Sequence, residues 1–192
     1  FLAKALKHVR NGGVWLVGPV TGCRTGNHTL YTSSTLHPEL EKAAGVETIF
    51  TYSPVHTGTT GSAFGLAAPL SMWSSFFRTA GAKSLGTADD ERLEGLSFLT
   101  EGKYGKGKIV MLGSLPSGKE GDAMLVRIIG HYADELRISQ KMILPEGNLA
   151  VPRTDKSGLF WIVVNMDGKG CSIKHGKNGR VRIEPYGYAI IR

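Results

Sequence analysis

The sequence predicts an α/β fold with a mostly parallel sheet, followed by a small antiparallel β domain. An amphipathic segment at residues 1–10 leads through a glycine turn into the apolar run at residues 14–17. A helix joined in this way to a buried strand is half of a βαβ crossover, which predicts a parallel sheet. After residue 138, short β-rich runs alternate with hairpin signals and show no helical pattern. We therefore expect domains at residues 1–140 and 141–192.

Composition sets limits on the partners and the location of the chain. The 192 residues are 41% hydrophobic and 20% charged, as in an ordinary globular protein with a buried core. No apolar run approaches the roughly 18 residues that cross a bilayer, so we expect no membrane contact. Cys23 and Cys171 lie far apart in sequence, which predicts no disulfide and is compatible with a reducing compartment. We expect a cytoplasmic location.

The charge balance is basic but does not indicate a nucleic-acid partner. The formal charge is +7, from 23 basic and 16 acidic residues. The denser basic groups, at residues 103–108 and 169–182, lie in glycine-rich turns without interleaved aromatic residues. Solvated hairpin tips explain these groups better than a nucleic-acid surface does.

The first residues have the pattern of a helix with one buried face. Leu2, Leu6 and Val9 recur at helical spacing, with basic residues on the other side. The chain starts without a methionine or a helix N-cap, so we expect it to come from a longer polypeptide. A processed mature N-terminus is the alternative.

The middle of the chain alternates between strands, one short helix and polar turns. Pro38 near the first turn and Gly45 at the end delimit a helix. The glycines of residues 104–108 supply the positive φ of a hairpin turn. The expected elements are a strand at residues 14–17, a polar loop at 21–35, a helix at 36–45, a strand at 46–52, an irregular stretch at 54–69, an apolar segment at 70–77, a short strand at 82–85, a polar turn at 89–95, and a hairpin formed by residues 96–101 and 108–112.

The strongest helix pattern in the chain covers residues 120–136. It is expected to place Leu125, Ile128, Ile129, Tyr132 and Leu136 on one apolar face. The tail that follows has a junction at residues 144–147. Its expected strands lie at residues 150–151, 159–164, 171–173, 181–183 and 188–191.

Four stretches together resemble the C-terminal half of a family-42 glycoside hydrolase, the bacterial β-galactosidases. The most specific of them is YGKGKIVMLG at residues 104–113. The others are NGGVWLVGP at residues 11–19, GCRTGNHT at 22–29 leading to LEKAAGV at 40–46, and IEPYGYAII at 183–191.

The resemblance implies a fold, an assembly and an activity. It implies a middle domain like the class I glutamine amidotransferases, a flavodoxin-like α/β fold whose start is missing here, followed by a small antiparallel β-sandwich. It also implies a homotrimer formed through that middle domain. The catalytic (β/α)8 barrel, with two glutamates that cleave β-D-galactosides with retention, would precede Phe1. No catalytic, cofactor-binding or metal-binding residue is therefore expected in this chain, and no cofactor. The short tail leaves the number of strands in the sandwich open.

Cys23 suggests a different function, that of an amidotransferase-like hydrolase. Those enzymes use a cysteine nucleophile on a G-x-C-x-G elbow with a histidine partner. Here Gly22 directly precedes Cys23, and no amphipathic helix follows to lower the thiol pKa. The spacing of the candidate bases selects none of them; they are His28, His37 and His56. A cysteine without a catalytic role is the preferred interpretation.

Other polar groups have structural explanations that we prefer. The carboxylates Asp89, Asp90, Glu91 and Glu94 suggest acid–base chemistry or a cation site, but a solvated turn explains them better. Residues 102–107 resemble a phosphate loop, yet they lead into a strand and lack the final Lys-Ser/Thr pair. His131 is expected on the surface of its helix or as a satisfied core residue. The triplet that begins at Asn27 fits a glycosylation site, which is inert in a bacterial cytoplasm.

Aromatic residues suggest an oligomer interface. Trp73, Phe76 and Phe77 follow an irregular apolar stretch, and core filling is their default role. We nevertheless expect that some residues between Phe64 and Phe77 contribute to a contact between subunits. A third function, a carbohydrate-binding accessory module, needs an exposed aromatic platform on the tail, where Trp161 is the only tryptophan and lies in an apolar strand.

The first hypothesis is therefore a non-catalytic assembly and support region of a β-galactosidase-like hydrolase. Its expected partners are identical subunits in a trimer, and a galactoside bound by the barrel.

Overall fold

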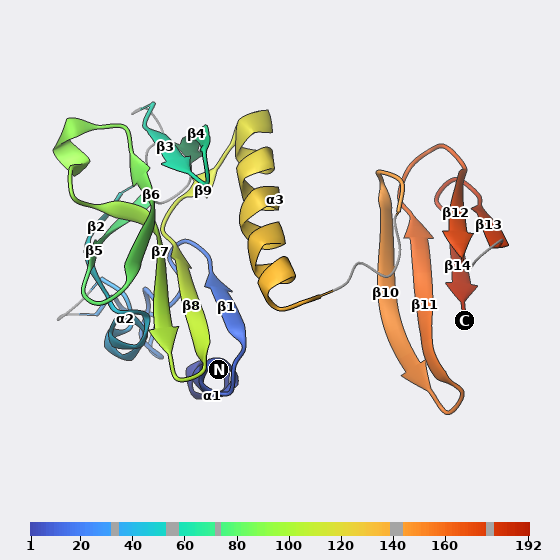
Figure 1. The fold of residues 1–192 in the computed structure, drawn as a ribbon, viewed down its shortest axis with the longest axis horizontal. Helices are drawn as coiled ribbons and strands as arrows, with labels where there is room; N and C mark the ends of the chain where they lie inside the picture. The colour runs from blue at the N-terminus through green and yellow to red at the C-terminus, as the bar shows by residue number, and fades with distance from the viewer. Residues whose placement is uncertain (32–34, 53–57, 72–73, 139–143, 176–178) are drawn as a thin grey trace. The chain divides into compact units, whose positions relative to one another are not determined.

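The computed structural model describes residues 1–31, 35–52, 58–71, 74–138, 144–175 and 179–192. The chain divides into two units, Phe1–Leu136 and Arg137–Arg192 (Figure 1). The expected boundary between residues 140 and 141 falls outside the described residues and stays a prediction. No helix in the described part of the chain is long and apolar enough to cross a membrane.

The first unit is built on one mixed sheet. The main strand order is β1-β8-β7-β6-β3-β4-β9, and β5 joins β7 to β2 beside this path. In chain order the elements are α1 (Leu2–Arg10), β1 (Val14–Val17), α2 (Pro38–Ala44), β2 (Val46–Tyr52), β3 (Thr60–Ala63), β4 (Leu66–Ser71), β5 (Ser74–Thr79), β6 (Lys83–Ala88), the 3₁₀ helix η1 (Glu91–Leu93), β7 (Ser97–Tyr104), β8 (Gly107–Leu112), β9 (Leu115–Pro116) and α3 (Gly118–Glu135).

The expected flavodoxin-like, mostly parallel sheet is wrong. Among the described strand pairs, only β1 and β8 run parallel, with Val14 opposite Lys108. The other pairs are antiparallel because short hairpins connect β3 to β4 and β7 to β8, and a short connection cannot join parallel strands. The α1–β1 unit did predict its own parallel pairing. The error was to extend that pairing to a chain that contains mostly strands.

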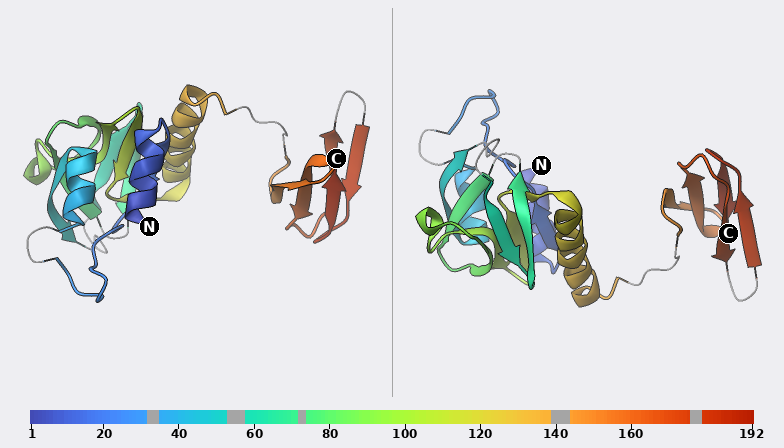
Figure 2. Two further views of the ribbon diagram at one scale, coloured as in Figure 1. Left: turned by 90° about the horizontal axis from the view of Figure 1, so that it is seen from below. Right: turned by 90° about the horizontal axis from the view of Figure 1, so that it is seen from above.

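Helices cover both faces of this sheet, and β8 separates the two cores. Ile109 and Met111 face a cluster that includes residues of α1 and α2. Val110 and Leu112 face the opposite cluster, which contains Met124, Ile128 and Tyr132 of α3. Figures 1 and 2 show how α1, α2 and α3 lie around the sheet. Helices thus cover both faces of β8, which agrees with its apolar residues on both sides.

The glycine-rich β7–β8 hairpin brings the sheet close to two helices. Gly105 has φ +63, and a Cβ there would lie 2.8 Å from Arg10 Cα at the end of α1. A Cβ at Gly102 would overlap the carbonyl oxygen of Ala44, the last residue of α2, and one at Gly107 would overlap that of Gly13. Positive φ thus explains Gly105, while close backbone packing explains Gly102 and Gly107.

Several expected elements need correction. The stretch at residues 54–69 contains a hairpin of β3 and β4 where we expected irregular structure. Its first residues, 54–57, lie outside the described residues. The expected short strand at 82–85 extends to Ala88. In α3 the buried residues are Gly121, Met124, Ile128 and Tyr132, whereas Ile129 and Leu136 are exposed.

The described residues of the second unit form five antiparallel strands in two sheets. Val163, Ile173, Ile183 and Ile191 form its core, with Trp161 half-buried against them. One sheet has the order β10-β11-β14 and the other pairs β12 with β13. The strands are β10 (Asn148–Asp155), β11 (Gly158–Asn165), β12 (Cys171–His175), β13 (Gly179–Ile183) and β14 (Tyr188–Ile191). Each strand expected in this tail is present, but β10 is eight residues long where only residues 150–151 were expected.

Candidate functional site on the third helix

An apolar surface lies where α3 meets the tip of the β3–β4 hairpin. Val126 is 71% exposed on the helix. Phe64 and Leu66 of the hairpin are half-buried beside it, and a shallow pocket runs between hairpin and helix. We call this the α3 surface and define it by Phe64, Leu66, Ala123, Val126 and Gly130; the polar residues Arg127, His131 and Asp134 line the same pocket. No other element of the described residues in this unit buries Val126.

Phe64 occupies an unusual backbone position in this surface. It has φ +53 and is followed by Gly65 at φ +76, so both residues of the two-residue turn between β3 and β4 have positive φ. Such a turn favours Asn-Gly, and the left-handed conformation costs a residue with a Cβ about 1–2 kcal/mol. The Phe64 ring lies 5.1 Å from the His131 ring, centroid to centroid. A strained residue that keeps a large side chain at this point indicates a use for that side chain.

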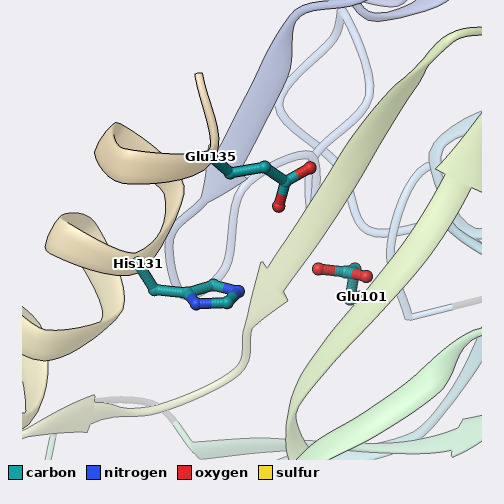
Figure 3. Close-up of side chains that lie close together, drawn as sticks. All are labelled: Glu101, His131 and Glu135. Atoms are coloured by element: carbon teal, nitrogen blue, oxygen red, sulfur yellow. The ribbon is translucent and has the colours of Figure 1, made fainter. Parts of the chain in front are cut away.

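A polar cluster beside this surface connects α3 to the β7–β8 hairpin. The Tyr132 hydroxyl donates to Glu101 Oε2 at 2.8 Å. Lys108 Nζ donates to the same oxygen at 3.3 Å and to Glu135 Oε2 at 2.8 Å. Figure 3 shows Glu101, His131 and Glu135 converging from β7 and α3. One lysine thus neutralises two carboxylates that come from different elements.

The local folding of both elements explains this convergence. The tight hairpin pairs Glu101 with Val110, which puts Glu101 diagonal to Lys108 across the two strands. His131 and Glu135 are four residues apart on α3 and so lie on one side of the helix. His131 is exposed, and its ring also contacts the Tyr132 ring at 4.9 Å. This agrees with the expectation of a histidine on the helix surface.

The electrostatics of the cluster keep both donors protonated. The Glu135 carboxylate, which accepts a hydrogen bond from Lys108, raises the pKa of the lysine above its ordinary value. Burial, followed by the hydrogen bond to Glu101, raises the pKa of Tyr132 well above its ordinary value. Lys108 therefore stays an ammonium and Tyr132 stays a hydrogen-bond donor.

The same cluster contains three groups of the kinds that bind metal ions. One ligand atom from each of Glu101, His131 and Glu135 lies within 4.8 Å of the other two. However, the Lys108 ammonium bonds to both carboxylates, and a divalent cation would have to displace it. The arrangement fits a structural ion-pair network better than a metal centre.

The cysteine that suggested an amidotransferase has no catalytic partner among the residues that the structure describes. Cys23 is half-buried against the core cluster that includes α1 and α2. No hydrogen bond joins its thiol to an imidazole in the described part of the chain. His37 instead accepts a hydrogen bond from Glu39 N at 3.2 Å and caps α2, His28 lies in a turn with φ +61, and His56 is outside the described residues.

The remaining candidates have structural roles. Asp90 caps η1 by accepting from Arg92 N at 3.0 Å, and its hydrogen bond to the Arg92 side chain lowers the pKa of the Asp90 carboxyl. Asp89, Glu91 and Glu94 are exposed around this short helix, as expected of a solvated turn. Asn27 is exposed in the turn that His28 completes.

The predictions made for the aromatic residues have different outcomes. Phe76 and Phe77 are 0% and 1% exposed, so their expected core role is confirmed. Trp73 lies outside the described residues. In the tail, Tyr186 and Tyr188 are 75% and 71% exposed. The hypothesis of an aromatic platform, which considered tryptophan alone, did not include these two exposed tyrosines.

Comparisons with known proteins agree with the family resemblance. Residues 1–139 match the family model of the β-galactosidase trimerisation domain. The chain is 46% identical over 204 residues to the β-galactosidase YesZ of Bacillus subtilis and 43% identical over 202 residues to YesZ of Bacillus licheniformis. All of this chain aligns, but it spans only 31% and 30% of the length of these two relatives.

A solved structure shows the same fold. The β-galactosidase of Bacillus circulans sp. alkalophilus superposes on 98% of this chain with a TM-score of 0.81, at 16% sequence identity. The match covers 30% of that chain. The mixed, mostly antiparallel sheet is thus the architecture of this part of such an enzyme.

Proposed function

Because the chain belongs to the β-galactosidase trimerisation domain family of family-42 glycoside hydrolases, we propose that it joins three copies of such an enzyme through its α3 surface. The observation that carries this proposal is the exposed apolar patch around Val126, bordered by Phe64 in its strained turn. Apolar patches of this kind, on a unit with its own complete core, mark contacts with other subunits.

The polar cluster supports the same proposal by fixing the helix that carries the patch. Lys108 and Glu101 connect the strands of the β7–β8 hairpin to Glu135 near the C-terminal end of α3. An interface element that is already held in place loses less conformational entropy on association. The α3 surface is therefore pre-organised for docking.

We further propose that bond cleavage takes place outside this chain. The chain spans about a third of the length of its curated relatives, and those relatives are named β-galactosidases. Retaining glycosidases need two carboxyl groups about 5–5.5 Å apart with the sugar between them. Glu101 and Glu135 lie close to each other, but the Lys108 ammonium bonds to both carboxylates, which makes them an ion-pair network. The substrate we propose for the whole enzyme is a β-D-galactoside.

Sedimentation velocity of the longer enzyme tests the assembly role. The unaltered protein is expected to sediment as a trimer. Val126→Asp puts a charge at the centre of the patch and is expected to weaken assembly by at least about 30-fold, the scale of an interface hot spot. Leu30→Asp is the matched control, since Leu30 is also exposed, at 63%, but lies away from α3.

Sedimentation of the two variants and the activity of the 192-residue chain each test one part of the proposal. A monomer with Val126→Asp and a trimer with Leu30→Asp support the proposal. A trimer of unchanged stability with Val126→Asp contradicts the α3 surface as the interface. Hydrolysis of a chromogenic β-galactoside by the 192-residue chain alone would contradict the placement of catalysis outside it.

A further inference from the structure

The second unit carries an apolar sheet face that nothing in its own described residues covers. Leu149, Val164 and Tyr188 stand in one row across β10, β11 and β14, and Val151, Ile162 and Ile190 in the next. Directly opposed residues of antiparallel strands point to the same side. We call these six residues the outer face. Tyr188, Ile190 and Leu149 in it are 71%, 54% and 50% exposed.

The opposite face of the same sheet is already packed. Val163 is fully buried, with Ala150 and Ala189 opposite it in the two neighbouring strands. These residues pack against Ile173 and Ile183 of the β12–β13 pair. An antiparallel sheet with one solvated face normally alternates apolar and polar residues, whereas strands covered on both sides are apolar throughout. β11 and β14 have the second pattern.

The size of the outer face limits what can cover it. The outer face offers six side chains. A stable complex between separate proteins uses roughly 20–30 residues on each partner. A second copy of the chain, packed only on this face, would therefore make too small an interface. A surface on the same polypeptide does not need an interface of that size because its effective concentration is high.

Charge indicates the chemistry of the covering surface. Residues 137–192 contain ten lysines and arginines against four aspartates and glutamates, so this unit holds most of the excess positive charge. Arg153 and Arg192 lie at one end of the outer face, beside Phe160. Arg192 stacks on the Phe160 ring at 5.1 Å and pairs with Asp155 at 2.9 Å, so Arg153 is the side chain on which the charge argument rests there. A complementary surface is apolar in its centre and acidic at its rim.

We propose that the outer face docks on an apolar, acid-rimmed surface of the same polypeptide, in the part of family members that this chain does not span. This inference rests on the proposed function in one respect, namely that the chain works as part of a longer β-galactosidase. The relatives leave more than two thirds of their length for such a surface. The β10–β11–β14 sheet then attaches the small β domain to the body of the enzyme.

Hydroxyl-radical footprinting of Tyr188 tests the proposal, with Tyr186 as an internal control. Tyr186 is similarly exposed but belongs to the turn before β14 and not to the outer face. In the 192-residue chain both tyrosines are expected to react at similar rates. In the longer enzyme Tyr188 is expected to react at least about fivefold more slowly, with Tyr186 unchanged. Arg153→Glu is expected to reduce this protection at low ionic strength, because it repels an acidic rim.

Each contrary result has a distinct meaning. Equal reactivity of Tyr188 in the chain and in the enzyme overturns the proposal. Protection in the isolated chain that rises with protein concentration identifies a second copy as the occupant and overturns it as well. Protection in the chain on adding a galacto-oligosaccharide identifies a sugar site and also overturns it. Sedimentation velocity of the same samples distinguishes a failure of the docking proposal from a failure of the assembly proposal. A trimer with unprotected Tyr188 contradicts only the docking proposal.

Discussion

Lys108 Nζ lies 2.8 Å from Glu135 Oε2, which ties the β7–β8 hairpin to the last turn of α3. The lysine side chain is 28% exposed, so this contact is more sheltered than an ordinary surface ion pair. Lys108→Met removes the shared cation and leaves two carboxylates facing each other. We expect a loss of about 1–2 kcal/mol in the free energy of unfolding, measured by urea denaturation.

The matched control for that substitution is Arg78→Met. Arg78 and Glu47 form a pair at 2.9 Å, but both side chains are about 60% exposed. A change of less than about 0.5 kcal/mol is expected there. Equal effects at the two sites would show that the Lys108 network adds nothing beyond surface charge.

Alkaline pH is expected to destabilise the first unit through Tyr132 and Lys108. Both groups have a pKa raised above the ordinary values of 10.0 and 10.5. A raised pKa means that the folded state holds the proton more tightly than the unfolded state does. The stabilisation is therefore complete below about pH 10 and is lost as pH rises toward the folded-state pKa.

Spectrophotometric titration at 295 nm checks this prediction. In the unaltered chain, the part of the absorbance increase that comes from Tyr132 should appear only when the chain unfolds. In Tyr132→Phe this late increase in absorbance should be absent. Ionisation of Tyr132 while the chain is still folded would contradict the prediction.

Gly102→Ala is expected to be strongly destabilising, because its Cβ would overlap the carbonyl oxygen of Ala44 at the end of α2. A backbone atom cannot move aside as a flexible side chain can, so we expect at least about 2 kcal/mol. Gly26→Ala is the control, since nothing lies within 4 Å of a Cβ there and φ is ordinary. If thermal unfolding places both variants at the same midpoint, the close packing of α2 on β7 is refuted.

Asn165 is expected to be essential for the second unit. It is 1% exposed, its side-chain amide donates to Lys169 O at 2.8 Å and Glu184 O at 3.1 Å, and its Oδ1 accepts from Asp167 N at 3.0 Å. Asn165→Ala removes these three hydrogen bonds, although Glu184 O keeps the one from Gly187 N, and we expect a loss of about 2–3 kcal/mol in the free energy of unfolding.

Hydrogen exchange can localise that effect. Exchange should accelerate in residues 148–191 and stay unchanged in α3. Asn148→Ala is a milder comparison, because Asn148 is only half-buried. Similar exchange in both variants would contradict a special role for Asn165.

The sequence predicted those elements whose end signals are local. Pro38 and Gly45 delimited α2, and Gly45 does adopt the left-handed cap conformation with φ +68. The β3–β4 hairpin was missed because Phe64-Gly65 replaces the Asn-Gly that normally marks its turn type. The overall sheet was mispredicted because one parallel unit, α1–β1, was given more weight than the many hairpins after it.

The site was harder to predict than the elements. The face of α3 was placed about one residue off, so that Ile129 was expected inside and Met124 was overlooked. The cluster of Glu101, Lys108 and Glu135 depends on tertiary contacts between a hairpin and a helix. A partial signal existed, since a two-residue turn at residues 105–106 already implies the diagonal pairing of Glu101 with Lys108.

The pairing of β1 with β8 has a consequence for the order of folding. It joins Val14 to Lys108 across more than ninety residues of chain, while the β7–β8 hairpin joins close neighbours. Closing the longer loop costs more entropy, so contacts of this range form late in a folding reaction. Substitutions such as Leu16→Ala in β1 should therefore accelerate unfolding and leave the refolding rate nearly unchanged, whereas a slowed refolding rate would place β1 in the folding nucleus.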